Sequence, residues 1–209
     1  MFYQLYANEM ADVDYQAIYN FISKYLNKKS LILDAGMGPG YLLKILIDNN
    51  YNAYGIDNDE GMLSYATNEL NLYGRVFYHD LLEPIDTMFD VVLCIFDVIN
   101  YFIEPKIVFK NIFNSLNKDG LFIFDIYKEE VLIKMAGFKE VHNDFSWETK
   151  VFKKKLKHLI KTSQESYEII QYAYDLNYYI KQLEELGFDV LVNKGPDIRK
   201  HYIIAKKTI

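Results

Sequence analysis

The segment that most constrains the fold of this chain is a glycine-rich turn between two apolar runs. Residues 34–41 read DAGMGPGY, with Leu31-Ile32-Leu33 before them and the apolar-periodic stretch 42–47 after them. This order predicts a buried strand, a tight turn and a helix. A glycine turn of this kind brings bare backbone close to a ligand and directs the N–H groups of the helix start toward it. The sequence therefore predicts a cradle for a nucleotide-like cofactor.

The spacing of the glycines distinguishes between two kinds of cofactor. Gly36 and Gly38 fit the dinucleotide fingerprint G-x-G-x-x-G/A, but Tyr41 occupies the place of its third small residue. A tyrosine there would crowd the close packing of helix on strand that a third glycine permits. The chain instead reads D-x-G-x-G-x-G from Asp34 to Gly40. An NAD-type oxidoreductase is therefore disfavoured.

Length and composition are those of one globular domain. A chain of 209 residues can bury a full core, so we expect a single domain over 1–209 with a lid or insertion at approximately 140–175. No apolar run reaches the ~20 residues that a membrane-spanning helix needs, and residues 1–6 lack the features of a secretion signal. The one cysteine, Cys94, lies in an apolar run and is expected to be a buried thiol. A cytoplasmic protein without a membrane partner is expected.

The charge of the chain is negative and unevenly distributed. The net charge is −6, so no global basic field attracts nucleic acid. Residues 1–148 carry 22 acidic and 11 basic side chains, whereas residues 149–209 carry 7 acidic and 12 basic ones. Much of the basic excess is the cluster Lys150–Lys161, which is more simply interpreted as a solvated face than as an RNA contact.

Strands and helices are predicted to alternate along the first 125 residues. Apolar runs of strand length end at or near Asp34, Asp57, Asp80, Phe96 and Asp125. Their near-continuous apolar character is typical of parallel strands that are covered on both faces. A helix over residues 12–27 precedes them, and another over 107–116 starts near Pro105. The pattern predicts an α/β fold with a doubly wound sheet.

The last third of the chain has a different pattern. Extended segments at 145–161 and 166–174 predict a β-hairpin appended to the sheet as a lid. An amphipathic helix then ends at Gly187. Strands are predicted at 188–193 and 201–205, and the link between them is too short for a helical crossover. We therefore expect an antiparallel ending.

These features resemble the class I S-adenosylmethionine-dependent methyltransferases. The D-x-G-x-G-x-G turn resembles their first motif, and residues 94–102 (CIFDVINYF) resemble an "FDSINYL"-like segment of small bacterial members, some of which N-methylate amino sugars. Residues 114–125 and the pair Asp14-Tyr15 are also similar to that group. The resemblance implies a Rossmann-like sheet of seven strands with an antiparallel last strand. It also implies S-adenosyl-L-methionine as cofactor and S-adenosyl-L-homocysteine as product.

Carboxylates at the strand ends suit different parts of this cofactor. Asp57 can accept both ribose hydroxyls, and Asp80 can accept the adenine amino group while Leu81 offers its backbone N–H to a ring nitrogen. Asp34 can orient the glycine turn or meet the ammonium group through water. The residues expected to contact the cofactor are Tyr15, Asp34, Gly36, Gly38, Gly40, Asp57, Asn58, Met62, Asp80, Leu81, Phe96 and Tyr101.

The identity of a general base stays open. Methyl transfer is a displacement in which alignment of acceptor, methyl and sulfur supplies most of the catalysis, although an amine acceptor must be neutral. The candidates are Tyr101, Tyr127, His142 and Glu168, with His79 ranked lower. Many relatives carry a glutamate–histidine pair on the lid strand, whereas Glu168 is followed by isoleucines here. Trp147 and nearby tyrosines could form an aromatic lid.

The expected function is methyl transfer to a nitrogen or oxygen atom of a small-molecule acceptor, without a metal ion. Two alternatives remain at this point. One is an RNA-modifying methyltransferase that uses the Lys150–Lys161 face. The other is a cofactor-binding subunit without catalysis. A monomer or a homodimer is expected.

Overall fold

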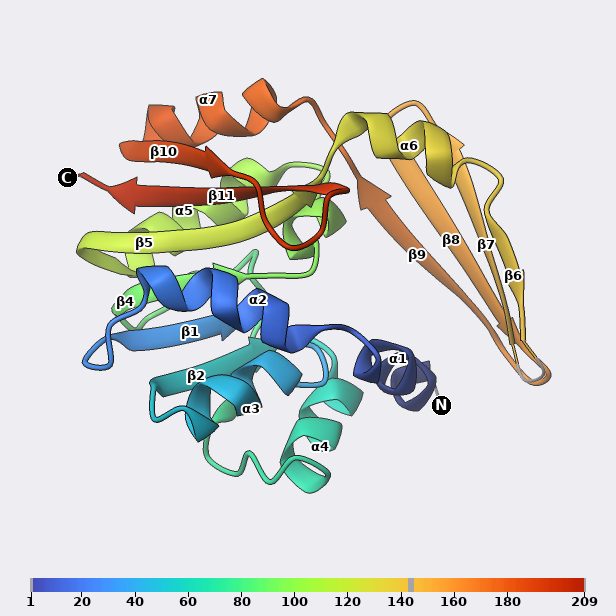
Figure 1. Ribbon diagram of the computed structural model, residues 1–209, viewed down its shortest axis with the longest axis horizontal. Helices are drawn as coiled ribbons and strands as arrows, with labels where there is room; N and C mark the ends of the chain where they lie inside the picture. Colours follow the sequence, from blue (N-terminus) through green and yellow to red (C-terminus); the bar gives the residue numbers. More distant parts are fainter. Residues whose placement is uncertain (1, 143–144, 209) are drawn as a thin grey trace.

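The strands of the protein form two separate β-sheets (Figure 1). The computed structural model describes residues 2–142 and 145–208. The strands of the larger sheet are β1 (Leu31–Ala35), β2 (Asn52–Asp57), β3 (Val76–Tyr78), β4 (Phe89–Cys94), β5 (Leu116–Tyr127), β10 (Phe188–Asn193) and β11 (Lys200–Lys207). Their order is β10-β11-β5-β4-β1-β2-β3, with parallel pairing from β5 to β3. This is the predicted doubly wound sheet of seven strands.

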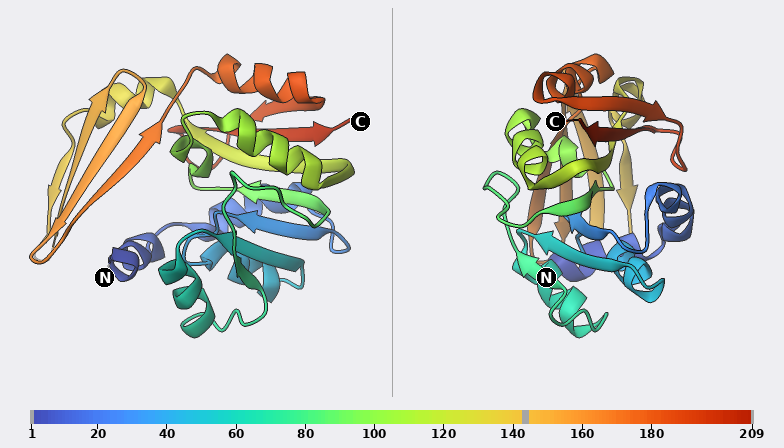
Figure 2. Two further views of the ribbon diagram at one scale, coloured as in Figure 1. Left: turned by 180° about the vertical axis from the view of Figure 1, so that it is seen from behind. Right: turned by 90° about the vertical axis from the view of Figure 1, so that its left-hand side faces the viewer.

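Helices cover both faces of the larger sheet (Figure 2). The helical segments are α1 (Phe2–Ala11), α2 (Tyr15–Ile22), η1 (Ser23–Tyr25), α3 (Tyr41–Asp48), α4 (Glu60–Asn68), η2 (Val98–Tyr101), α5 (Pro105–Ser115), α6 (Glu129–Met135) and α7 (Leu176–Leu186). Buried residues of α2 and α3 belong to one core cluster, and those of α5 and α7 to another. The parallel strands are therefore covered on both sides, which explains their near-continuous apolar sequences.

Alternate residues of each strand serve these two core clusters. On β1, Ile32 packs with α2 and α3 while its neighbour Leu33 packs with α5 and α7. On β5, Ile123 likewise packs with α2 and α3, and its neighbour Phe124 packs with α5 and α7. The two-residue period of a strand thus places successive apolar side chains in different cores. Cys94 belongs to the second core and is fully buried, as predicted.

The antiparallel ending is confirmed. β11 pairs antiparallel with both β5 and β10, from Lys200 opposite Tyr127 to Lys207 opposite Phe188. α7 ends at Gly187, whose φ of +102° is the left-handed conformation expected of a C-terminal glycine. Only the short segment 194–199 joins the last two strands. No helical crossover is possible there, and the strand direction reverses.

Some element boundaries differ from the sequence expectation. β5 begins at Leu116 rather than at residue 121, because the expected turn at 117–120 forms a bulge inside the strand. Asp119 adopts φ +63° in this bulge, and the register on β4 shifts between Phe89 and Val91. The helices α1 and α6 were not predicted at all.

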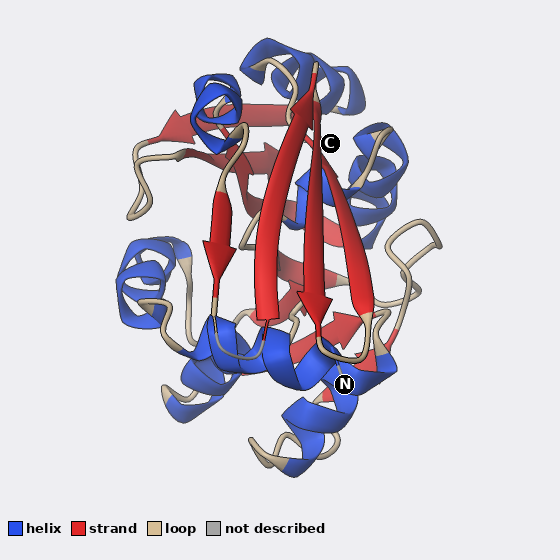
Figure 3. Ribbon diagram, turned by 90° about the vertical axis from the view of Figure 1, so that its right-hand side faces the viewer, coloured by secondary structure: helices blue, strands red, loops and turns tan. Residues whose placement is uncertain are grey.

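The lid is a sheet of four strands and not a two-stranded hairpin. Its strands are β6 (Lys139–Val141), β7 (Phe145–Phe152), β8 (Lys155–Thr162) and β9 (Ser166–Tyr172), all antiparallel in the order β6-β7-β8-β9 (Figure 3). The predicted segment 145–161 contains a turn at Lys153, whose φ is +55°. A turn made of lysines carries no Gly, Pro or Asn signal, so no local pattern predicts that this segment divides into two strands. The sheet contains no strand of the larger sheet.

Side-chain to backbone hydrogen bonds fasten the lid sheet to the body. The Asn100 amide donates to the Tyr172 carbonyl at 2.7 Å, and its oxygen accepts from the Tyr127 N–H at 3.1 Å. The Tyr174 hydroxyl donates to the Ile103 carbonyl at 3.0 Å. The lid sheet runs from Lys139 to Tyr172, within a few residues of the expected 140–175. Treating 1–209 as a single domain remains a prediction.

Candidate cofactor and methyl-transfer site

The glycine turn connects β1 to α3 in the backbone conformations that the sequence requires. Gly36, Gly38 and Gly40 have φ of +73°, +54° and +87°. These left-handed values favour glycine. The Ile56 carbonyl accepts from the N–H of Gly36 at 2.8 Å and of Met37 at 3.1 Å, which fixes the turn against β2.

The three glycines have different surroundings. A Cβ on Gly36 would lie 2.7 Å from a methyl of Val98, and one on Gly40 would lie 3.1 Å from Leu72. A Cβ on Gly38 would meet nothing within 4 Å. Gly38 therefore faces open space, while Gly36 and Gly40 are required by close packing as well as by φ.

Asp57, at the end of β2, organises the loops around the turn. Its Oδ2 accepts from the Gly38 N–H at 2.8 Å, and its Oδ1 accepts from the Asp59 N–H at 2.9 Å. Burial raises the pKa of Asp57, and the backbone donors oppose this shift. Asp59 in turn caps α4 by accepting from Gly61 at 2.7 Å and Met62 at 3.1 Å. One carboxylate thus joins the glycine turn to the start of the next helix.

Asp34 lies beneath the turn and not in the cavity. Its side chain is 3% exposed, and burial followed by the charge of Asp57 raises its pKa to about 7. Its Oδ2 has no hydrogen-bond partner within residues 2–142 and 145–208. Because Asp34 is buried beneath the turn, its side chain does not reach the cavity.

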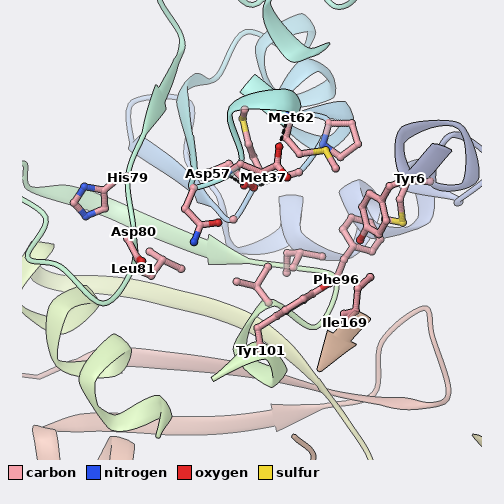
Figure 4. A pocket seen from close by; sticks show the side chains of 18 of the residues that line it. Tyr6, Met37, Asp57, Met62, His79, Asp80, Leu81, Phe96, Tyr101 and Ile169 are labelled. Atoms are coloured by element: carbon pink, nitrogen blue, oxygen red, sulfur yellow. Dashed lines mark hydrogen bonds between the residues drawn. The ribbon is translucent and has the colours of Figure 1, made fainter. Parts of the chain in front are cut away.

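A cavity of about 450 Å³ lies in front of the turn (Figure 4). The residues predicted to contact the cofactor that line it are Tyr15, Gly36, Gly38, Asp57, Asn58, Met62, Asp80, Leu81, Phe96 and Tyr101. Asp34 and Gly40 from the same prediction do not line it. The structure therefore brings most of the predicted set together, and their role as cofactor ligands stays a prediction.

One end of the cavity is formed by the segment after β3. His79, Asp80 and Leu81 lie together at this end in Figure 4. Asp80 Oδ1 accepts from the Leu82 N–H at 2.9 Å, which holds the carboxylate in a tight turn. The His79 Nε2 contacts the Glu83 carbonyl at 3.3 Å and is engaged in that turn rather than aimed at a substrate.

The other end of the cavity is aromatic. Tyr15 packs against Phe96 with ring centroids 5.0 Å apart. Tyr6, from the unpredicted helix α1, is hydrogen-bonded to Tyr101, and Ile169 of β9 completes this end in Figure 4. Desolvation raises the pKa of Tyr6 to about 12 and that of Tyr101 well above its usual value. Both phenols are therefore protonated at neutral pH.

The floor beneath Phe96 is held by a buried ionic cluster. Phe96 and Asp97 have φ of +67° and +56°, and Asp125 accepts hydrogen bonds from both of their N–H groups. The Lys200 ammonium lies 2.6 Å from Asp97 Oδ1 and 3.2 Å from Asp125 Oδ1. The two carboxylates raise the pKa of Lys200 well above its usual value in spite of its burial. Non-glycine residues keep a left-handed conformation only where surrounding contacts hold them in it. The hydrogen bonds to Asp125 hold Phe96 and Asp97 in this way.

Three of the predicted base candidates lie outside the cavity, and whether any candidate acts as a base stays a prediction. The Glu168 carboxylate pairs with Lys157 on the other face of β9 from Ile169, as strand alternation requires. His142 pairs with Glu140 at 3.0 Å and stacks on Phe145. The base candidates that line the cavity are Tyr101 and the lower-ranked His79.

Tyr127 is also outside the cavity, beside the ionic cluster. Its ring lies 5.2 Å from the Lys200 ammonium, and burial raises the pKa of its hydroxyl. Trp147, the expected aromatic lid residue, directs its indole N–H to His158 at 3.2 Å and does not line the cavity. The described part of the chain holds no cluster of three or more potential metal ligands, and none of its helices is long and apolar enough to cross a membrane.

Sequence reasoning missed several residues of the site. Tyr6 was missed because α1 was not predicted, and Lys200 because its partners are distant in sequence. Ile169 could have been found, since a lid strand with Glu168 outside must direct Ile169 inward.

The strand order, the glycine turn and the polar strand ends together define a Rossmann-like methyltransferase. The sequence matches the family model described as "Methyltransferase domain" over residues 6–192, and the chain belongs to this family. The predicted class, an S-adenosylmethionine-dependent methyltransferase, is therefore confirmed, and S-adenosylmethionine is the cofactor of that class.

The curated proteins with similar sequences include the following two. A candidate methyltransferase of Geobacillus sp. (strain WCH70) is 27% identical over 214 residues, which cover 89% of this chain and 87% of that protein. The malonyl-(acyl-carrier protein) O-methyltransferase of Bacillus anthracis is 27% identical over 150 residues, which cover 68% of this chain and 52% of that protein.

The solved structures that share the fold include the following two. An S-adenosylmethionine-dependent methyltransferase from Clostridium acetobutylicum ATCC 824 superposes with a TM-score of 0.83 at 24% identity, covering 100% of both chains. The sugar N-methyltransferase KedS8 from Streptoalloteichus sp. ATCC 53650 gives a TM-score of 0.80 at 15% identity, covering 99% of this chain and 93% of that one. At these identities the likeness concerns the fold.

Proposed function

We propose that this protein transfers the methyl group of S-adenosylmethionine to a nitrogen or oxygen atom of a small molecule. One observation carries the proposal. The cavity is lined jointly by the glycine turn, the ends of the parallel strands and Ile169 of the lid sheet. A ligand cradled by the turn would therefore lie beside an acceptor that is covered by the lid. Such a covered cavity favours a small acceptor over a macromolecule.

The residues present fit the cofactor. The open space at Gly38 leaves room for its amino-acid end against the backbone. The Asp57 oxygens accept backbone hydrogen bonds from Gly38 and Asp59 and retain lone pairs for the ribose hydroxyls. Asp80 and the backbone of Leu81 would hold the adenine edge. When bound, the cofactor supplies a methyl group activated by its cationic sulfur.

The chain would catalyse the reaction mainly by alignment. Tyr6, Tyr101 and Ile169 form the end of the cavity away from the proposed adenine position, where the acceptor would be held (Figure 4). The two phenols are protonated, so they can orient an acceptor by hydrogen bonds but cannot act as phenolate bases. An amine acceptor would enter neutral and lose its proton to water after transfer. Proximity and orientation can supply several orders of magnitude in rate.

Among the similar proteins, the sugar N-methyltransferase KedS8 supports a small acceptor, and the proteins differ in the atom that they methylate. KedS8 is a sugar N-methyltransferase, whereas the Bacillus anthracis relative is an O-methyltransferase. The RNA-modifying alternative gains no support from the lysine cluster, because Lys150, Lys154 and Lys157 form ion pairs with glutamates. The cytoplasmic location is kept as part of this proposal.

Calorimetric titration with S-adenosylhomocysteine, followed by transfer of a labelled methyl group to a panel of amines and hydroxylated metabolites, tests the proposal. We expect saturable binding of S-adenosylhomocysteine, none of NAD, and methylation of one acceptor class. Salt-sensitive methylation of RNA in place of any small molecule would contradict the proposed acceptor. Binding without turnover on any acceptor would support the non-catalytic alternative.

A further inference from the structure

A chain of hydrogen-bonded polar side chains runs from the lid sheet to the floor of the cavity. It begins at Trp147 on β7, whose indole N–H donates to Nδ1 of His158 on β8 at 3.2 Å. The Nε2 of His158 lies 3.2 Å from Oε1 of Gln171 on β9. The Gln171 amide nitrogen donates to Oδ2 of Asp97, which lies in the floor next to Phe96. The chain thus crosses the lid sheet and ends on the body.

The directions of these hydrogen bonds assign one tautomer to His158. Its Nδ1 accepts from Trp147 and also lies 2.9 Å from the Thr149 hydroxyl, so this nitrogen carries no proton. Nε2 therefore carries the proton and donates to the Gln171 oxygen. That bond orients the Gln171 amide so that its nitrogen points to the carboxylate of Asp97. Each donor in the chain faces an acceptor.

The two central members of the chain are buried. His158 is 4% exposed and Gln171 is 3% exposed. Removing one member of a buried hydrogen-bonded pair leaves the other unsatisfied, which costs more than the net strength of the bond. Separating the lid sheet from Asp97 would therefore leave the buried Gln171 amide without its acceptor, at a cost in free energy.

Two members of the chain, His158 and Asp97, adjoin residues that line the cavity. His158 is paired directly with Ile169 across β8 and β9, and Ile169 lines the cavity. Asp97 follows Phe96, which also lines the cavity and whose left-handed conformation depends on the ionic cluster with Lys200. The hydrogen bond from Gln171 to Asp97 therefore connects the lid wall of the site to its floor.

We propose that Gln171 and His158 are positioning residues that latch the lid sheet onto the Phe96–Asp97 turn and so fix the lid wall of the site against its floor. The proposal rests on the proposed function only for the identity of the ligand in the cavity. The Asn100–Tyr172 bond is a second attachment of the lid. Loss of the latch is therefore expected to loosen the lid sheet without unfolding the body.

The substitution Gln171→Leu tests the latch, because it removes both hydrogen bonds and preserves most of the side-chain volume. Amide hydrogen exchange in β8 and β9 should become about tenfold faster, which corresponds to the loss of about one buried hydrogen bond. Exchange in β1 and β4 should stay unchanged. Gln164→Leu is the matched control, because Gln164 is exposed at the tip of the same sheet. Equal exchange in the Gln171 and Gln164 variants would overturn the proposal.

Two substitutions at His158 provide an independent arm, which also serves if Gln171→Leu fails to fold. His158→Gln keeps an amide donor toward Gln171 and should retain slow exchange in β8 and β9. His158→Leu removes the donor and should speed exchange as Gln171→Leu does. Equal exchange in the two His158 variants would contradict the role of the Nε2 proton.

Ligand affinity separates this inference from the proposed function. S-adenosylhomocysteine should bind Gln171→Leu several-fold more weakly than Gln164→Leu, because Phe96 is less firmly held. If the wild-type protein does not bind S-adenosylhomocysteine, the proposed function fails, and the exchange experiment still decides on the latch. If affinity and exchange are both unaffected by Gln171→Leu, the latch is absent.

Discussion

Asp57 Oδ2 accepts a hydrogen bond from the backbone N–H of Gly38 at 2.8 Å, which joins the end of one strand to the turn after its neighbour. The turn after β1 and the end of β2 therefore form one rigid unit. In the proposed complex this unit would hold the ribose and the amino-acid end of the cofactor together.

Replacing Asp57 should weaken cofactor binding. Asp57→Ala removes the proposed acceptor of the ribose hydroxyls and also frees the N–H groups of Gly38 and Asp59. We expect the dissociation constant of S-adenosylhomocysteine to rise by one to two orders of magnitude, about 1.5–3 kcal/mol for charge-assisted hydrogen bonds. Asp189→Ala, an exposed change on β10, is the control. Unchanged affinity in calorimetric titration would refute the placement of the ribose at Asp57.

Substitutions at Gly36 and Gly38 should have different effects on the stability of the protein and on its affinity for S-adenosylhomocysteine. Gly36→Ala places a methyl group 2.7 Å from Val98 and should lower the free energy of unfolding, as measured by urea denaturation. Gly38→Ala meets no atom within 4 Å, so its effect on stability is limited to its φ of about +54°, on the order of 1 kcal/mol. Its methyl group should nevertheless reduce affinity for S-adenosylhomocysteine. Equal losses of stability in the two variants would be inconsistent with the packing described.

The buried Lys200 should be important for stability. Lys200→Met leaves the Asp97 and Asp125 carboxylates without their cation and should cost about 3–5 kcal/mol in the free energy of unfolding. Lys206→Met removes only an exposed partner of Asp119, and a change of about 1 kcal/mol or less is expected. Denaturant titration of both variants gives the comparison. Similar midpoints for the two would show that the buried cluster is not structural.

Stability should depend on pH through His158. Burial lowers its pKa from the ordinary 6.5, so the unfolded chain binds the proton more readily than the folded one. The stabilisation of the folded state by neutral His158 is therefore fully present above pH 6.5, and it is lost as the pH falls through the lower pKa of the folded state. Asp34 acts in the opposite direction, because its pKa is raised to about 7 and acidification to that range favours its folded form.

The contribution of His158 is isolated by comparison with His158→Gln, which cannot titrate. The wild type should lose stability relative to this variant as the pH is lowered below 6.5. Parallel pH profiles for the two proteins would mean that His158 titrates alike in the folded and unfolded states.

The parts that were predicted from sequence depend on local patterns. The doubly wound sheet followed from apolar runs that alternate with helical periodicity, and the glycine turn from three glycines at fixed spacing. Asp57 and Asp80 could be placed in one cavity because the carboxyl ends of parallel strands share one edge of a sheet. These inferences needed no knowledge of tertiary contacts.

The missed parts depend on contacts between distant residues. Lys200 meets Asp97 only because β11 inserts beside β5, and no local pattern marks that lysine. In the sequence, Gln171 and His158 look like ordinary polar strand residues, and only the arrangement of the lid sheet shows their contacts. The direction of the Glu168 side chain was also not predicted: it pairs with Lys157, while the neighbouring Ile169 lines the cavity.

The most direct test is a crystal structure of the protein soaked with S-adenosylhomocysteine. Its amino-acid end should lie against Gly36 and Gly38, its ribose hydroxyls on the Asp57 carboxylate, and its adenine beside Asp80. Its sulfur should face the aromatic end formed by Phe96 and Tyr101. An empty cavity at saturating ligand, or a ligand bound elsewhere on the protein, would contradict the proposed site.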